Sequence, residues 1–249
     1  MVQFCEEESM NIGVIFAGGV GTRMHGKEKP KQFLMIHNKP IIVHTIEHFE
    51  KNELVDAVVV CVKEWIEYFN TLILEYRLQK VKAVVPGGET GQLSIYNGLC
   101  AAKKIAGDQD AVVLIHDGVR PLINSQLLTD NIEAVRKYGN AITSGIVQET
   151  IIEISSEGVV KVVPDREHSR VAKAPQSFML NDILTVHKKA LKENKINFVD
   201  SCTMMKNYGF ELHIVDGPHD NIKITTQEDF YLMRAILQAK EDSQLYSIY

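Results

Sequence analysis

The stretch that decides the fold is Ile12-Gly13-Val14-Ile15-Phe16-Ala17-Gly18-Gly19-Val20-Gly21-Thr22-Arg23-Met24, an apolar run that ends in a glycine-rich loop. The apolar run is typical of a buried β-strand. Glycines directly after a strand let backbone N–H groups approach a phosphate closely. The pattern therefore predicts an α/β protein with a phosphate-binding loop at the carboxyl end of its first strand.

Similar apolar runs recur along the chain and alternate with amphipathic stretches. We expect strands at Ile12–Phe16, Ala57–Val62, Val81–Val85, Ala111–His116, Ala141–Val147 and Glu211–Val215. We expect helices at Pro40–Glu50, Glu64–Leu78, Gly91–Ile105, Ser125–Tyr138, Leu180–Glu193 and Thr226–Ala239. Apolar strands separated by helices imply a Rossmann-like, mostly parallel sheet with helices on both faces. Ligands of such sheets bind beyond the carboxyl ends of the strands.

One segment, Glu149–Val163, breaks this alternation. Thr150–Ile154 and Val159–Val163 read as two short strands around the turn Ser156–Gly158, and a polar, charged stretch follows at Asp165–Lys173. We therefore expect a β-hairpin arm over about residues 148–173 that projects from a single domain at residues 10–241. Residues 1–9 are expected to form a disordered extension. A projecting arm commonly docks on a partner subunit.

The composition limits the partners. The net charge of −5 over 249 residues provides no global basic field for nucleic acid or an anionic membrane. No apolar run approaches the length of a membrane span. The four cysteines lack the spacing of a zinc or redox motif, so reduced thiols and a cytoplasmic location are expected. Anionic substrates would have to be met by local clusters of lysine and arginine.

The glycine-rich loop differs from two familiar phosphate loops. A Walker A loop needs Gly-Lys-Ser/Thr, whereas this loop has Gly21-Thr22-Arg23. A dinucleotide fingerprint needs a glycine where Met24 stands, which argues against an NAD-dependent reductase. The loop is instead bracketed by two cations, Arg23 and Lys31. They either converge on a bound phosphate or form a solvated surface pair.

Two further strands end in suggestive loops. Pro86–Ser94 contains Gly87 and Gly88 and is either a second phosphate- or base-binding turn or a plain tight turn. His116-Asp117-Gly118-Val119-Arg120-Pro121 places a carboxylate where it can hold Mg²⁺ against nucleotide phosphates. Alternatively, Asp117 caps the turn or pairs with Arg120, and His116 orients or packs the segment.

The sequence lacks the motifs of hydrolytic and covalent catalysis. No G-x-S-x-G elbow, catalytic cysteine context or H-E-x-x-H occurs. A phosphate monoester with a second pKa of about 6 is already a competent nucleophile at neutral pH and needs no general base. Its attack on another phosphate needs positioning and neutralisation of charge, for which lysine, arginine and Mg²⁺ are the expected groups.

Taken together, the ordered motifs resemble the sugar-phosphate nucleotidyltransferases. The resemblance covers about Ile12 to Ile236 and is closest to one branch, the methylerythritol 4-phosphate and ribitol 5-phosphate cytidylyltransferases. It rests on Ala17–Met24 with Pro30-Lys31-Gln32-Phe33, Gly87-Gly88 with Ser94, His116-Asp117 with Arg120-Pro121, Ala174-Pro175-Gln176-Ser177-Phe178, and Asp220-Asn221-Ile222-Lys223.

The resemblance implies a role for each of these positions. It implies catalytic contacts to the CTP phosphates and the attacked phosphorus from Arg23, Lys31 and Lys223. It implies nucleotide binding by Ala17, Gly18, Gly19, Gly21, Thr22, Gly87, Gly88, Ser94 and Asp117. Asp117 and Asp220 would hold Mg²⁺, and the sugar or polyol phosphate would be bound by Arg120, Arg166, Lys173 and Asp200. Arg166, on the arm, would reach into the site of the partner subunit in a homodimer.

One departure bears on the substrate. The methylerythritol enzymes typically carry threonine before the Pro-Gln pair, whereas this chain has Ala174, preceded by Lys173. The context is more similar to the ribitol enzymes, which make CDP-ribitol for teichoic acid or capsular polymers. We expect CTP and D-ribitol 5-phosphate as substrates, with methylerythritol 4-phosphate in isoprenoid synthesis as the alternative. A non-catalytic scaffold that kept the fold is the remaining reading, although it would have no need for converging cations.

Overall fold

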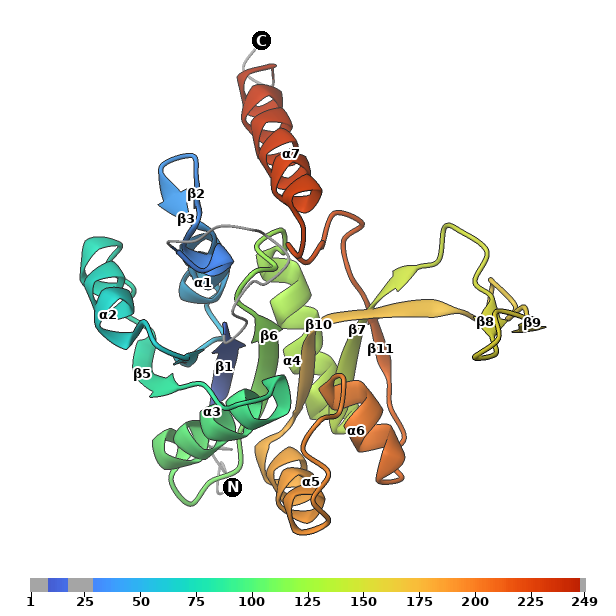
Figure 1. The fold of residues 1–249 in the computed structure, drawn as a ribbon. Coiled ribbons are helices and arrows are strands. Elements are labelled where there is room, and N and C mark those ends of the chain that lie inside the picture. Colours follow the sequence, from blue (N-terminus) through green and yellow to red (C-terminus); the bar gives the residue numbers. More distant parts are fainter. Residues whose placement is uncertain (1–8, 18–28, 247–249) are drawn as a thin grey trace, which may run out of the picture.

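The computed structural model describes residues 9–17 and 29–246, so the predicted extension at residues 1–9 lies, apart from Ser9, outside the described residues. At its centre is a seven-stranded sheet in the order β11-β7-β10-β6-β1-β4-β5 (Figure 1). All neighbouring strands are parallel except β10, which is antiparallel to β6 and β7. The strands are β1 (Asn11–Phe16), β4 (Ala57–Val62), β5 (Val81–Pro86), β6 (Val112–Asp117), β7 (Asn140–Ile146), β10 (Arg170–Met179) and β11 (Ile214–Asp216). The expected Rossmann-like, mostly parallel sheet is confirmed.

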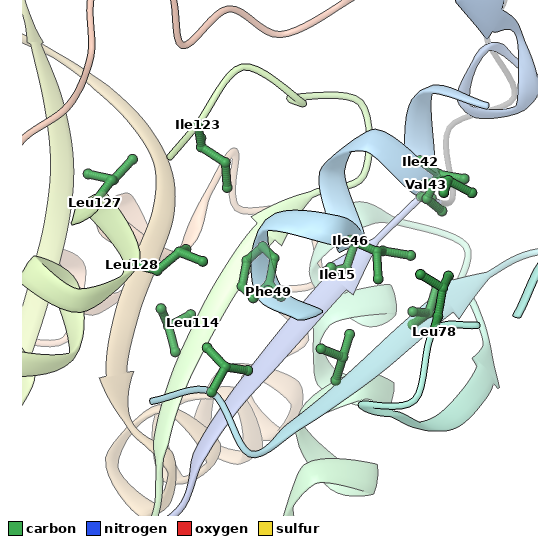
Figure 2. Packing of buried hydrophobic residues seen from close by; sticks show 14 of the residues in the cluster. Ile15, Ile42, Val43, Ile46, Phe49, Leu78, Leu114, Ile123, Leu127 and Leu128 are labelled. Atoms are coloured by element: carbon green, nitrogen blue, oxygen red, sulfur yellow. The ribbon is translucent and has the colours of Figure 1, made fainter. Parts of the chain in front are cut away.

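Helices cover both faces of this sheet. One face packs against α1 (Ile41–Lys51), α2 (Ile66–Glu75) and α4 (Ser125–Tyr138), and the other against α3 (Gly91–Ala106), α5 (Leu180–Lys192) and α6 (Ser201–Asn207). Successive strand residues face opposite sides, so Ile15 lies in the first core and Val14 in the second. Figure 2 shows Ile46 and Phe49 of α1 lying against the strands that carry Ile15 and Leu114. Burial on both faces explains the continuous apolar runs in the sequence.

Helix α3 is held close to the sheet by a glycine. A Cβ atom at Gly98 would lie 2.6 Å from Val14 Cγ1 and 2.7 Å from Cys61 Sγ, so no larger residue fits without a shift. This close packing brings the beginning of α3, at Gly91, to the edge of the sheet where β1 and β4 end. The glycine therefore helps to place the second glycine-rich turn beside the carboxyl end of β1.

Strand β10 and helix α6 were not among the predicted elements. Asp165–Lys173 was expected to be a polar stretch, but β10 begins at Arg170 and continues as one strand to Met179. The outer half of β10 is exposed, and its buried inner half contains Gln176 and Ser177. Such a strand has neither a continuous apolar run nor a clean alternation. Strand β11 is also shorter than predicted, because it begins at Ile214 rather than Glu211.

The predicted arm is present. Strands β8 (Glu153–Ile154) and β9 (Val160–Val162) form an antiparallel pair that projects away from the central sheet (Figure 1). The arm is strongly apolar for an exposed segment, because large hydrophobic side chains are solvent-exposed at Ile151, Ile152, Ile154, Val159, Val160, Val162 and Val163. Contiguous exposed apolar surface of this kind is typical of a docking surface.

The C-terminal helix α7 (Gln227–Tyr246) anchors two loops at the same edge of the sheet. Its residue Met233 packs with Val119 and Ile224 in a third apolar cluster, beside the small hairpin of β2 (Met35–Ile36) and β3 (Lys39–Pro40). The loops after β6 and before α7 are thereby held together. Among the described residues, no helix combines the length and the apolar character that a membrane span requires.

Candidate active site

Two adjoining pockets open where β1, β4, β5 and β6 end, because these parallel neighbours bring their carboxyl ends to one edge. The glycine-loop pocket, of about 340 Å³, is lined by Phe16, Ala17, Lys31, Gln32, Lys63, Gly88, Glu89, Thr90, Gly91, Ser94, Asp117, Val119 and Lys223. The β10 pocket, of about 330 Å³, is lined on its polar side by Asp117, Arg120, Lys173, Gln176, Asp200 and Lys223. Both pockets include Phe16, Gly91, Asp117 and Lys223. A ligand in each pocket would therefore meet the other at Asp117 and Lys223.

Asp117 organises the cations at this junction. Lys223 Nζ lies 2.6 Å from Asp117 Oδ1, and Arg120 Nε lies 3.2 Å from Asp117 Oδ2. Burial by itself would raise the pKa of Asp117, but the charges of Lys223 and Arg120 outweigh it and lower that pKa below its ordinary value. The carboxylate is thus ionised and fixes both cations. The pairing of Asp117 with Arg120, one of the alternatives open from the sequence, is observed.

The turn that follows Asp117 is held by three side chains beneath it. His116 Nε2 donates to the Arg120 carbonyl at 2.9 Å, Thr45 Oγ1 donates to the Gly118 carbonyl at 3.1 Å, and His48 Nε2 donates to the Pro121 carbonyl at 2.9 Å. Burial lowers the pKa of His116 to about 4, so its ring is neutral at neutral pH. His116 therefore orients the segment, as expected.

Lys31 is brought to the glycine-loop pocket by the short helix η1 (Lys31–Phe33). Its Nζ donates to the Ile224 carbonyl at 3.0 Å, next to Lys223. The neighbouring Gln32 is buried and donates through Nε2 to the Ala17 carbonyl at 2.8 Å. Two predicted cations, Lys31 and Lys223, therefore converge from opposite ends of the sequence. The predicted residues Gly18, Gly19, Gly21, Thr22 and Arg23 lie outside the described residues.

The second glycine-rich turn shapes the other side of the glycine-loop pocket. Ser94 Oγ accepts from the Gly88 backbone N–H and donates to the Thr90 carbonyl, both at 3.0 Å. A Cβ atom at Gly88 would lie only 2.4 Å from Leu93 Cβ, so the turn requires glycine there. Gly88 and Ser94 line the pocket, whereas Gly87 lines neither pocket and stays a prediction. The hydroxyl of Ser94 holds the turn in shape, so a ligand would meet mainly the backbone.

The predicted polyol-side residues Lys173 and Asp200 both line the β10 pocket. Burial and the nearby charge of Arg120 lower the pKa of Lys173, whose Nζ donates to the His219 carbonyl at 3.3 Å. The two oxygens of Asp200 are already engaged, since they accept from the Thr203 backbone N–H at 2.8 Å and from Gln176 Nε2 at 3.1 Å. Asp200 therefore begins helix α6 and shapes the pocket wall.

Two predicted site residues lie away from these pockets. Arg166 is on the exposed arm, where its Nη1 lies 3.5 Å from the Gln148 carbonyl. Asp220 lines neither pocket, and its Oδ2 lies 2.6 Å from Lys240 Nζ on α7. Their proposed contacts to substrate and metal stay predictions.

Sequence reasoning missed several polar residues that line the pockets, among them Lys63, Gln92 and His187. Lys63 directly follows β4, so the same rule that singled out Asp117 could have found it. Gln92 lies within the glycine-rich stretch Pro86–Ser94, in which only the glycines and Ser94 were predicted to bind. His187 lies on a helix among ordinary apolar and charged neighbours, and its sequence context carries no signal. Their positions are set by the packing of α3 and α5.

One carboxylate at this site, that of Asp117, could hold a magnesium ion in place of one of its paired cations. Magnesium in nucleotide enzymes is commonly held by one or two carboxylates together with substrate phosphates, and Asp117 is buried at the junction of the two pockets. In residues 9–17 and 29–246, no group of three or more acidic, histidine or cysteine side chains is arranged so that it could hold a metal ion. The phosphates of a nucleotide would therefore have to supply most of the ligands, and Asp220 would not contribute from its present position.

Comparison with known proteins decides the family. Residues 12–239 match the family described as IspD, 2-C-methyl-D-erythritol 4-phosphate cytidylyltransferase. The chain belongs to this family. It is therefore a nucleotidyltransferase, and the readings as a scaffold or a reductase are set aside.

The relatives divide by their named substrate. This cytidylyltransferase is 54% identical over 240 residues to ribitol-5-phosphate cytidylyltransferase of Streptococcus agalactiae, covering 96% of this chain and 100% of that one. It is 52% identical to the enzyme of the same name from Vibrio parahaemolyticus, covering 95% of this chain and 100% of that one. A solved 4-diphosphocytidyl-2C-methyl-D-erythritol synthase from Anaerococcus prevotii superposes with a TM-score of 0.79 at 27% identity, covering 92% of this chain and 96% of that one.

Proposed function

We propose that this cytidylyltransferase converts CTP and D-ribitol 5-phosphate to CDP-ribitol and pyrophosphate. The observation that carries the proposal is the junction at Asp117 and Lys223, where a pocket lined by the glycine-rich turn of Gly88 and Gly91 meets a second that presents Arg120 and Lys173. The proposal is supported by the names of relatives that are 52–54% identical over their full length. We further propose that CDP-ribitol serves as a precursor of teichoic acid or a capsular polymer.

The reaction requires little more than positioning and charge. A phosphate oxygen of ribitol 5-phosphate attacks the α-phosphorus of CTP, the bond from that phosphorus to the bridging oxygen of the β-phosphate breaks, and pyrophosphate leaves. Lys223 lies at the junction, where it can bind both the attacking phosphate and the α-phosphate. Lys31 can neutralise negative charge that develops on the CTP side, and Arg23 is proposed to act with it. A magnesium ion beside Asp117 would neutralise further charge on the triphosphate.

Asp117 contributes by holding its cations in place. Because Asp117 pairs with both Lys223 and Arg120, neither side chain has to be ordered when substrates arrive. Interactions that are already in place before the reaction do not lose energy to reorganisation. Arg120 also donates through Nη1 to the Asn221 carbonyl at 3.0 Å, which ties it to the segment that carries Lys223.

The residues before the Pro-Gln pair favour ribitol phosphate over methylerythritol phosphate. Ala174 is buried in the wall of the β10 pocket and offers no hydroxyl to a substrate. Lys173 beside it adds a cation to the same pocket. Ribitol 5-phosphate has a longer carbon chain than methylerythritol 4-phosphate. It can use the space that alanine leaves at position 174 and an additional charged contact at Lys173.

The substrate is tested by measuring pyrophosphate release with CTP and Mg²⁺, offering ribitol 5-phosphate and methylerythritol 4-phosphate in parallel. We expect kcat/KM to be at least about 100-fold higher for ribitol 5-phosphate, as is common when a pocket discriminates by polar contacts. A preference for methylerythritol 4-phosphate would keep the cytidylyl transfer and refute the choice of polyol. Omitting Mg²⁺ in a parallel reaction tests the proposed metal requirement.

We also propose that the enzyme is a homodimer joined through the arm and works in the cytoplasm. The dimer is supported by the exposed apolar side chains of the arm, among them Ile154, Val160 and Val162. It would place Arg166 beside the polyol phosphate of the partner subunit. The cytoplasmic location is supported by the use of CTP and by cysteines that are free at Cys61, Cys100 and Cys202.

Charges on the arm should separate the subunits. We expect Val160→Asp with Val162→Asp to give a monomer in sedimentation analysis, because burying two carboxylates in an apolar interface is costly. The activity should fall at least about tenfold at equal protein concentration if Arg166 acts in the partner's site. A carboxylate introduced at exposed Leu74 of α2, which is off the arm and lines neither pocket, is the matched control. A fully active monomer would refute the role of the arm.

A further inference from the structure

The β10 pocket is lined by residues of three helices as well as by the cations of the junction. Asp117, Arg120 and Lys223 line it at the junction, whereas Ile95, His187 and Met204, on α3, α5 and α6, line the part that we call its inner end. Its volume of about 330 Å³ lies in the range of small-molecule sites. The pocket therefore has room for more than a phosphate group.

His187 at the inner end is suited to bind a hydroxyl group. The side chain is only 1% exposed, and within residues 9–17 and 29–246 neither ring nitrogen has a hydrogen-bond partner. Burial lowers the pKa of His187 to about 4, so the ring is neutral and offers one N–H donor and one acceptor nitrogen. Tyr96 stacks on the ring with centroids 5.8 Å apart. Buried polar groups are seldom left without a partner.

Two other polar side chains of the lining, those of Gln92 and Gln176, are already committed. Gln92 donates through Nε2 to the Lys195 carbonyl at 2.8 Å and accepts from the Phe198 backbone N–H at 2.9 Å. Gln176 accepts from the Cys202 backbone N–H at 2.8 Å and donates to Asp200. These contacts hold the pocket wall in place. The imidazole of His187, in contrast, lines the pocket with both ring nitrogens unpartnered among the described residues.

We infer that the inner end of the β10 pocket is the subsite for the hydroxyl group of the polyol farthest from its phosphate, and that His187 is a specificity-determining residue. This inference rests on the proposed function. With the phosphate held by Arg120, Lys173 and Lys223, an extended polyol chain runs inward past the small side chain of Ala174. Its C–H groups pack on Ile95 and Met204, and its terminal hydroxyl reaches His187.

The test pairs a change in the enzyme with a change in the substrate. Erythritol 4-phosphate lacks one CHOH unit of ribitol 5-phosphate and should not reach His187. We expect His187→Leu to raise KM for ribitol 5-phosphate about tenfold and to leave KM for CTP within about twofold. The kcat/KM for erythritol 4-phosphate should stay within about threefold of the wild-type value, so the advantage of the longer substrate largely disappears. His187→Gln keeps a donor and an acceptor and should restore much of that advantage.

A matched control is available at His213. Its ring also stacks on a tyrosine, Tyr138, with centroids 4.4 Å apart, and it lines neither pocket. His213→Leu should leave the ratio of the two kcat/KM values unchanged, and thermal melting checks that each variant is folded. If His187→Leu does not fold, nitrogen NMR of the wild-type protein replaces it, and the ring resonances of His187 should shift with ribitol 5-phosphate but not with CTP.

The outcomes separate this inference from the proposed function. An equal loss with both polyol phosphates, or no loss with either, would overturn the subsite while leaving the reaction in place. A wild-type enzyme that does not use ribitol 5-phosphate would remove the proposed function and the subsite with it. Only a loss confined to the longer substrate supports the role of His187.

Discussion

Replacing Lys223 with methionine is expected to lower kcat/KM by about 1,000-fold while the protein remains folded. Lys223 lies in both pockets, so its ammonium group can act on the attacking phosphate and on the α-phosphate of CTP. Removing one preorganised group that stabilises transition-state charge commonly costs about 100- to 1,000-fold, and Lys223 would serve two phosphates. Steady-state kinetics with CTP and ribitol 5-phosphate measure the loss. It should appear mainly in kcat if the contact is strongest in the transition state.

Lys240 provides the control for this prediction. Its Nζ lies 2.6 Å from Asp220, the same distance that separates Lys223 from Asp117, and it is 53% exposed compared with 42% for Lys223. Lys240→Met removes a similar ion pair outside both pockets, so kcat/KM should change by less than about twofold. Equal losses in the two variants would show that Lys223 acts through stability and not through the phosphates.

Replacing Asp117 with asparagine is expected to lower kcat/KM by at least about 100-fold and the free energy of unfolding by about 2 kcal/mol. The carboxylate is buried and pairs with Lys223 and Arg120. Its loss releases Lys223 from its fixed position and leaves the largely buried Arg120 without a counter-charge. Breaking a fully buried pair costs about 3–5 kcal/mol. The smaller value allows for the solvent that reaches Lys223.

The effect on stability should depend on pH. The pKa of Asp117 is lower in the folded protein than in the unfolded chain, where it is about 3.9. The carboxylate therefore contributes stability above about pH 4, and this contribution is lost as the pH falls through the folded-state value. Urea unfolding at pH 7 and pH 3 should show a difference between wild type and Asp117→Asn that shrinks at the lower pH. A difference independent of pH would contradict a charge-based origin.

Glu47 is the matched control for Asp117. Its carboxylate also contacts two cations, at 2.6 Å from Lys39 Nζ and 3.6 Å from Lys51 Nζ, and it lies outside both pockets. Glu47→Gln should cost less than about 1 kcal/mol of stability and should not affect turnover, because this pair is solvent-accessible. A comparable loss of activity in this variant would mean that Asp117 has no special place in the reaction.

Much of the fold was predictable because its signals are local. The buried strands β1, β4 and β6 are continuous apolar runs, and the loops that follow them contain the glycines and charges on which the site prediction depended. A strand that is buried on both faces cannot avoid this pattern. The hairpin arm was also predictable, since a turn between two β-branched runs is a short-range signal.

The elements that were missed owe their structure to distant partners. Strand β10 buries Gln176 and Ser177, which is possible because Asp200 accepts from Gln176 and Asn131 accepts from the Ser177 hydroxyl at 2.9 Å. Neither partner can be identified from the neighbouring sequence. Helix α6 likewise depends on the cap supplied by Asp200, in a segment too short for a helical period to be recognised.

The sequence by itself determined the layered α/β fold, the edge at which ligands bind and the identity of most candidate groups, because apolar periodicity and glycine-rich turns are local consequences of backbone sterics and burial. The tertiary structure alone decided that Lys223 and Arg120 share the carboxylate of Asp117, that Asp220 faces α7 instead, and that His187 lies buried beside the site. These relations join segments far apart in the chain. Only packing of the sheet and helices brings such segments within the few ångströms over which charges and hydrogen bonds act.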